Sequence, residues 1–172
     1  MDLDILRLLA RHRTPVLTTI AQWAMDIGTN DLILLLAGLA MLGVVIAGRW
    51  WQQGIAIGAS VLVAQALARG LKGIIARARP PADLAVVQVG AFSMPSTVAA
   101  MTAALAVALY SIVPWRVGHR RPAAGLLVTF VVLIGFAMVY LGAHWPTDVL
   151  AGWSVGMVVG VAVVRLTRTM SR

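Results

Sequence analysis

Five apolar runs of roughly membrane-crossing length constrain this chain more than any other feature. They cover residues 32–48, 52–70, 95–113, 123–141 and 147–164. Because a helix rises ~1.5 Å per residue, ~20 apolar residues cross a hydrocarbon layer about 30 Å thick. The composition, 60% hydrophobic and 12% charged with a mean hydropathy of +0.91, supports the same interpretation. We therefore expect an all-α fold, a polytopic bundle of transmembrane helices that forms one membrane domain over residues 1–172.

Residues 1–28 are expected to form an interfacial or amphipathic N-terminal segment. Residues 2–13 alternate apolar and charged positions at helical spacing, which is typical of a helix lying on the membrane surface. Residues 15–28 are apolar but short and contain Asp26, so they lie at the interface or form a tilted partial span. The bundle would then hold about six helices. Acidic residues stand where a signal peptide has its basic segment, so we expect no cleavable signal.

The formal net charge of +8 comes from thirteen arginines and one lysine against six acidic residues. On a soluble protein this excess would suggest nucleic acid, but basic residues of membrane proteins gather in cytoplasmic loops and meet anionic headgroups. If the five runs alternate in direction, one end collects Arg49, Arg116, Arg120, Arg121, Arg165, Arg168 and Arg172. We expect this end to be cytoplasmic, in a bacterial-type plasma membrane. The expected partners are membrane lipids, with no nucleic acid.

The opposite end carries ionisable residues that the spans do not need. Lys72, the only lysine, and Arg79 are seven positions apart, so both point to one side if the helix continues to Pro80. A lysine at the end of a span also occurs without function, where its amine reaches the interface.

Two further segments reach the same end under this topology. Ser96 opens an apolar run, where free N–H groups and the positive end of the helix dipole can bind an anion, although a plain N-cap explains it equally. Pro146 suits the first position of a helix, which places His144 just before that helix and Asp148 in its first turn. A carboxylate beside a histidine orients its ring and fixes its tautomer, and the alternative is an interfacial histidine with a dipole-compensating aspartate.

Together these residues indicate phosphoryl transfer at a membrane surface. Cations and helix N-termini bind phosphate, and a histidine backed by a carboxylate is a nucleophile or a base. A structural or interaction protein is the alternative, and it predicts that Lys72 and His144 lie far apart in space.

The spacing resembles the type 2 phosphatidic acid phosphatase superfamily of membrane lipid phosphatases, whose pattern is K-x6-R-P, then P-S-x-H, then S-R-x5-H-x3-D. The stretch "KGIIARARP" from Lys72 matches the first motif in full. The stretch "PSTV" from Pro95 matches the second motif except at its last position. The stretch "HWPTD" from His144 keeps the histidine and the aspartate of the third. The resemblance covers about residues 50–165.

This resemblance implies roles for the matching residues. His144 would attack phosphorus and form a phosphohistidine, and Asp148 would orient and activate it. Lys72, Arg79 and Ser96 would hold the phosphate oxygens. The family works without a metal, so the resemblance implies no cofactor.

Three positions depart from the family pattern. Val98 stands in place of the general-acid histidine, and Ala137 and Met138 stand in place of the serine and the phosphate-binding arginine. Arg77 could partly replace the missing charge at the phosphate, although two residues from Arg79 it would project differently.

The absence of a general-acid histidine restricts the kinds of lipid phosphate that such a site could hydrolyse. A positioned general acid contributes roughly 10²- to 10⁴-fold, and an alkoxide leaving group, with a conjugate acid near ~15.7, needs its proton. A phosphate leaving group, with a relevant pKa of about 6, departs without that help. Either the substrate is a lipid diphosphate such as a polyprenyl diphosphate, or the chain is a catalytically impaired homologue that binds or carries a lipid phosphate headgroup.

Overall fold

The computed structural model describes residues 1–87 and 89–170 and is helical nearly throughout. Its elements are α1 (Asp2–Arg11), α2 (Pro15–Thr29), α3 (Asp31–Gly48), α4 (Trp51–Ile75), the short 3₁₀ helix η1 (Ala82–Leu84), α5 (Thr97–Ile112), α6 (Val117–Tyr140) and α7 (Pro146–Met170). The described residues contain one isolated bridge, between Ala78 and Phe92, and no strand. The predicted all-α membrane bundle is confirmed.

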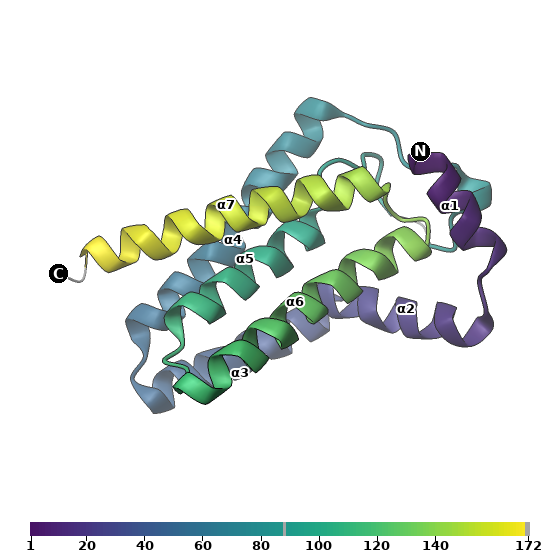
Figure 1. The fold of residues 1–172 in the computed structure, drawn as a ribbon. Coiled ribbons are helices and arrows are strands. Elements are labelled where there is room, and N and C mark those ends of the chain that lie inside the picture. Colours follow the sequence, from purple (N-terminus) through teal and green to yellow (C-terminus); the bar gives the residue numbers. More distant parts are fainter. Residues whose placement is uncertain (88, 171–172) are drawn as a thin grey trace.

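Successive helices from α4 to α7 run in opposite directions, so their connections fall at two ends of the bundle (Figure 1). The site end holds residues 76–96 and 141–145, and α1 lies beside it. The arginine-rich end holds the connections α3–α4 and α5–α6 and the last turns of α7. Of the seven arginines expected there, Arg49, Arg116, Arg165 and Arg168 belong to these segments and Arg120 and Arg121 to the first turns of α6, while Arg172 is outside the described residues.

Within the part of the chain that the structure describes, three helices, α4, α6 and α7, are long and apolar enough to cross a membrane. Helices α2 and α3 are bent by 58° at the break between them and together qualify as one further span. Helix α5 is apolar but has 16 residues. The expected run 32–48 is therefore one arm of a bent pair, a broken span or a re-entrant loop, whose other arm is residues 15–28, and run 95–113 corresponds to a helix shorter than a full span.

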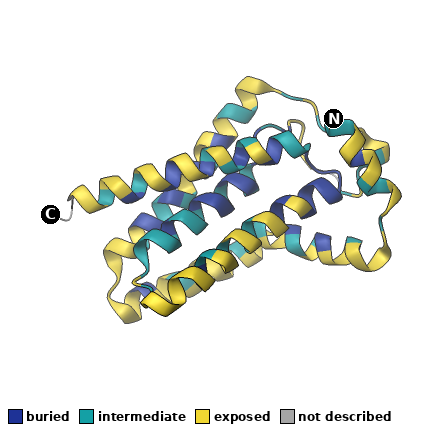
Figure 2. Cartoon of the chain, in the orientation of Figure 1, coloured by how far each residue is buried: buried dark blue, intermediate teal, exposed yellow. Residues whose placement is uncertain are grey.

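Small residues let α5 and α7 approach backbone to backbone. A Cβ atom added to Gly152 of α7 would lie 2.5 Å from the carbonyl oxygen of Ser96 and 2.8 Å from Cβ of Ala99. Burial is concentrated in α5 and in the site end of α6, whereas the outer faces of the helices stay exposed (Figure 2). This crossing holds the start of α5 against the start of α7 and so fixes two segments of the site relative to each other.

The helix ends at the site differ in part from expectation. Helix α7 begins at Pro146, as predicted. Helix α4 does not continue to Arg79 but ends at Ile75, because Ala76 adopts a left-handed conformation (φ 47°, ψ 33°) and turns the chain. Lys72 therefore projects from the last turn of a helix, and Arg79 projects from the loop that follows it.

Candidate active site

A cavity of about 160 Å³ lies at the site end, between α2, the end of α4, the start of α5 and the α6–α7 turn. Its polar lining comes from Thr29, Lys72, Arg79, Thr97 and His144. Because Lys72 and His144 line the same cavity, the prediction that they lie far apart, made for a purely structural protein, is wrong.

His144 is 6% exposed and presents its two ring nitrogens to different partners. Nη1 of Arg79 lies 3.1 Å from Nε2, and because a guanidinium only donates, Nε2 accepts with its lone pair. The proton then sits on Nδ1, which lies 3.5 Å from Oδ2 of Asp148. That distance exceeds a formed hydrogen bond, and Nδ1 has no hydrogen-bond partner among the described residues. Asp148 therefore orients the ring through charge, and its carboxylate is the acceptor nearest to Nδ1.

The surroundings of His144 favour its neutral form. Burial lowers the pKa of His144 below its usual 6.5, Asp148 opposes this effect, and the positive charges of Arg79 and Lys72 add to it. A neutral imidazole with its lone pair on Nε2 is the form that can act as a nucleophile.

Asp148 is fully buried and its carboxylate is held by protein donors. Nη1 of Arg77 donates to Oδ1 at 2.8 Å, and the backbone N–H of Trp145 donates to Oδ2 at 2.9 Å. A buried carboxylate needs such partners to stay ionised. The ion pair with Arg77 therefore fixes both the charge and the position of the group that faces His144.

The guanidinium of Arg77 binds both Asp148 and the N-terminal helix α1. Its Nη2 donates to Oδ2 of Asp2 at 2.9 Å, its Nη1 donates to Oγ1 of Thr147 at 2.6 Å, and its guanidinium lies 5.2 Å from the ring centre of Trp145. The residues that line the cavity do not include Arg77. The structure thus brings Arg77 to Asp148 and α1 and does not bring it to the expected phosphate position.

Ser96 is fully buried and caps α5. Its Oγ accepts from the N–H of Ala99 at 3.4 Å and donates to Sδ of Met138 at 3.4 Å, while its own N–H donates to the carbonyl of Asp148 at 3.0 Å. The side chain that lines the cavity is that of the next residue, Thr97. The predicted alternative, a plain N-cap, therefore describes the Ser96 hydroxyl better than contact with a phosphate.

Sequence reasoning missed two hydroxyls of the cavity. Thr97 stood inside the motif "PSTV" at the position the family leaves free, so its place in the motif was the available signal. Thr29 comes from α2 and has no motif, because only the folding of α2 over the site brings it there.

Two of the three residues that depart from the family pattern line this cavity. Val98 and Met138 present apolar side chains to it, whereas Ala137 is buried and does not line it. Cγ1 of Val98 packs against Gly28 of α2 so closely that a Cβ atom at Gly28 would overlap it. An apolar contact with α2 therefore occupies the position at which the family has its acid.

Lys72 and Arg79 supply the positive charge of the cavity. Lys72 is half-buried, and its ammonium makes no hydrogen bond or ion pair within the described part of the chain. Arg79 is held by two carbonyl oxygens, because its Nε donates to Gly90 at 2.7 Å and its Nη1 donates to Ala143 at 2.5 Å. One uncommitted ammonium, one oriented guanidinium and the first N–H groups of α5 can together bind a phosphate beside His144.

Solved structures share this fold. The phosphatidylglycerolphosphate phosphatase of PAP2 type from Bacillus subtilis superposes with a TM-score of 0.86 and 27% identity, over 99% of this chain and 86% of that one. Aquifex aeolicus LpxE superposes with a TM-score of 0.77 over 95% of this chain and 94% of that one, and at 21% identity it is evidence of the fold alone.

Sequence relatives extend the comparison. The decaprenylphosphoryl-5-phosphoribose phosphatase of Mycobacterium tuberculosis is 30% identical over 73% of this chain and 67% of its own length. The undecaprenyl-diphosphatase of Sulfolobus acidocaldarius is 30% identical over 67% of this chain, which is 56% of its own length. The sequence model of the PAP2 superfamily matches residues 50–172. The chain therefore belongs to the PAP2 superfamily of membrane phosphatases, as its three spaced motifs predicted.

Proposed function

We propose that this protein hydrolyses a lipid phosphate or diphosphate, such as a polyprenyl diphosphate, through a phosphohistidine on His144 and without a metal. The observation that carries the proposal is the arrangement around Nε2 of His144. This nitrogen holds a lone pair at a cavity that also contains Lys72 and Arg79, while Nδ1 on the other side of the ring faces the buried Asp148.

The proposed reaction has two steps. In the first, the Nε2 lone pair forms a bond to the terminal phosphorus, and the bond from phosphorus to the bridging oxygen breaks, with its electron pair going to the leaving lipid phosphate. Arg79 turns from Nε2 to the phosphate oxygens as the phosphate enters, and Asp148 stabilises the positive ring. In the second, the oxygen of a water molecule forms a bond to phosphorus while the bond from phosphorus to Nε2 breaks and returns its electron pair to Nε2. Inorganic phosphate leaves with the protons of the water, and neutral His144 is restored.

Val98 favours a diphosphate as the substrate. An apolar side chain cannot donate the proton that an alkoxide leaving group needs, whereas a phosphate, with a relevant pKa of about 6, leaves as an anion. Two relatives carry names that refer to polyprenyl substrates, decaprenylphosphoryl-5-phosphoribose and an undecaprenyl diphosphate, and they support the polyprenyl class.

The arginine-rich opposite end supports an extracytoplasmic site in a bacterial-type plasma membrane.

A second candidate function is binding or carriage of a lipid phosphate headgroup by an impaired homologue. Two observations favour it. Val98, packed against Gly28, stands where the family has its general-acid histidine. Nη1 of Arg79 already donates a hydrogen bond to the lone pair on Nε2 of His144, the proposed nucleophile. Both candidates use Lys72 for the phosphate, so they differ only in turnover.

The test is phosphate release by the purified protein in detergent, with a polyprenyl diphosphate and the matching monophosphate side by side. We expect release from the diphosphate, abolished in His144→Ala and retained in His119→Ala, which removes an exposed histidine at the arginine-rich end. In Val98→His we expect release from the monophosphate to rise by up to about 10²-fold, because an acid is restored.

No release from either substrate, together with headgroup binding that Lys72→Ala abolishes, would establish the second candidate instead. Release that persists in His144→Ala would contradict the phosphohistidine and with it the proposed mechanism.

A further inference from the structure

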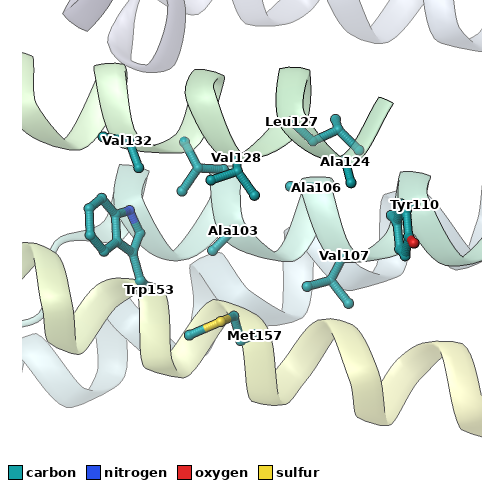
Figure 3. A pocket seen from close by; sticks show the side chains of 11 residues that line it. Ala103, Ala106, Val107, Tyr110, Ala124, Leu127, Val128, Val132, Trp153 and Met157 are labelled. Carbon is teal, nitrogen blue, oxygen red and sulfur yellow. The ribbon is translucent and has the colours of Figure 1, made fainter. Parts of the chain in front are cut away.

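A second cavity lies far from the candidate active site, between α5, α6 and α7 (Figure 3). This groove has a volume of about 480 Å³ and an almost wholly apolar lining, with Ala103 and Val107 of α5, Val128 of α6 and Met157 of α7 on its walls. Val128 is 63% exposed, so the groove opens to the outside of the bundle. Two of these three helices are membrane spans, so their surroundings are lipid.

The length of the groove matches one leaflet of a bilayer. Its lining on α6 runs from Ala124 to Val132, a rise of about 12 Å, and half of a ~30 Å hydrocarbon core is about 15 Å. Because α6 and α7 cross the membrane and Val128 is exposed on the outside of the bundle, the acyl chains of surrounding lipids are the apolar groups that meet this groove.

The positively charged side chain of Arg120 lies at the arginine-rich end of this groove. Arg120 lies one helical turn before Ala124 and so on the same face of α6. Nε of Arg120 donates to the hydroxyl of Tyr110 at 3.2 Å, and the guanidinium lies 5.3 Å from the centre of that ring. Tyr110 is itself part of the groove lining, so the pair forms a polar end to an otherwise apolar space.

We propose that this groove binds an anionic phospholipid of the leaflet at the arginine-rich end, with one acyl chain in the groove and the lipid phosphate on Arg120. The guanidinium has further N–H donors beyond its bond to Tyr110, and their fork geometry suits phosphate oxygens. This lipid site is at the end of the bundle opposite to His144 and does not depend on the proposed reaction.

Native mass spectrometry of the purified protein tests the site, with phosphatidylglycerol and phosphatidylcholine of identical acyl chains as probes. We expect one retained phospholipid and a preference for phosphatidylglycerol. Arg120→Gln should lower that preference about 5-fold, the effect of ~1 kcal/mol per basic residue at an anionic surface. Arg49→Gln, which removes an arginine from the α3–α4 turn at the same end, should leave the preference unchanged.

Filling the groove tests the acyl chain separately. Val128→Trp should reduce retention of both lipids, whereas Leu126→Trp, at a 72% exposed position of the same helix outside the lining, should not. Thermal unfolding in detergent verifies that both variants fold. Equal retention in both tryptophan variants would overturn the proposal. A stable dimer that Val128→Trp dissociates would also overturn it, because a second copy of the chain would then cover the groove.

Discussion

Single side chains decide the chemistry available at the site end. Asp148 accepts hydrogen bonds from Arg77 and from the N–H of Trp145. Its Oδ2 atom also lies 3.5 Å from Nδ1 of His144. Arg79 meets Nε2 on the other side of the ring. The imidazole is thus held between an anion and a cation, and this arrangement fixes which nitrogen carries the lone pair.

The depressed pKa of His144 predicts an acid limb in the activity. Protonation removes the Nε2 lone pair, so kcat/KM should be level near neutral pH and fall only as the pH drops through a value below 6.5. The measurement is kcat/KM of phosphate release between about pH 4.5 and 8.

The substrate phosphate also titrates near pH ~6, so the acid limb needs a control. Asp148 raises the pKa of His144, and Asp148→Asn should therefore move the limb to still lower pH. A limb that belongs to the substrate would stay in place in this variant. A limb above pH 6.5 that His144 causes would contradict the predicted direction.

At the scale of elements, the crossing of α5 and α7 positions the site. Gly152 lies against the carbonyl oxygen of Ser96, and the N–H of Ser96 donates to the carbonyl of Asp148. The N-cap of one helix is therefore bound to the first turn of the other. Helix α1 joins the same turn through Asp2, which accepts from both Arg77 and Thr147.

This crossing predicts a strong effect of side-chain size at Gly152. Gly152→Val should lower the free energy of unfolding by roughly 1–3 kcal/mol, because the added carbons overlap the backbone of α5 and force the helices apart. Thermal or denaturant unfolding in detergent measures the change. Gly125→Ala is the matched control, since a Cβ atom there meets nothing within 4 Å, and it should not lower the stability, because alanine favours a helix more than glycine does. Equal effects at the two positions would contradict the close crossing.

At the scale of the whole molecule, the alternation of helices separates the candidate active site from the arginine-rich end (Figure 1). One end holds the cavity with His144, and the other holds most of the arginines that lie away from this cavity. The proposed orientation, with the arginines in the cytoplasm, follows from this separation.

The chain contains no cysteine, so single introduced thiols report its orientation without background. Ala82→Cys places a thiol on the exposed loop at the site end, and Val117→Cys places one at the 95% exposed start of α6. In intact bacterial cells a membrane-impermeant thiol reagent should label Ala82→Cys, and it should label Val117→Cys only after the membrane is permeabilised. The reverse pattern would put the candidate active site in the cytoplasm.

Properties that depend on neighbours in the chain could be predicted from the sequence. Apolar runs determine membrane helices locally, because each span must satisfy its own backbone in lipid. Pro146 marked the start of α7, and the spacing of Lys72, Arg79 and His144 identified the family and three residues that line one cavity.

Only the tertiary structure decided where the remaining groups point, because these contacts join residues far apart in the chain. Arg77 meets Asp2 across 75 positions and Asp148 across 71, and these contacts hold it away from the cavity beside His144. Helical periodicity reports neither the left-handed turn at Ala76 nor the bend between α2 and α3. The sequence by itself thus determined the membrane helices and the residues of the motifs, and the fold decided which side chains line the cavity beside His144.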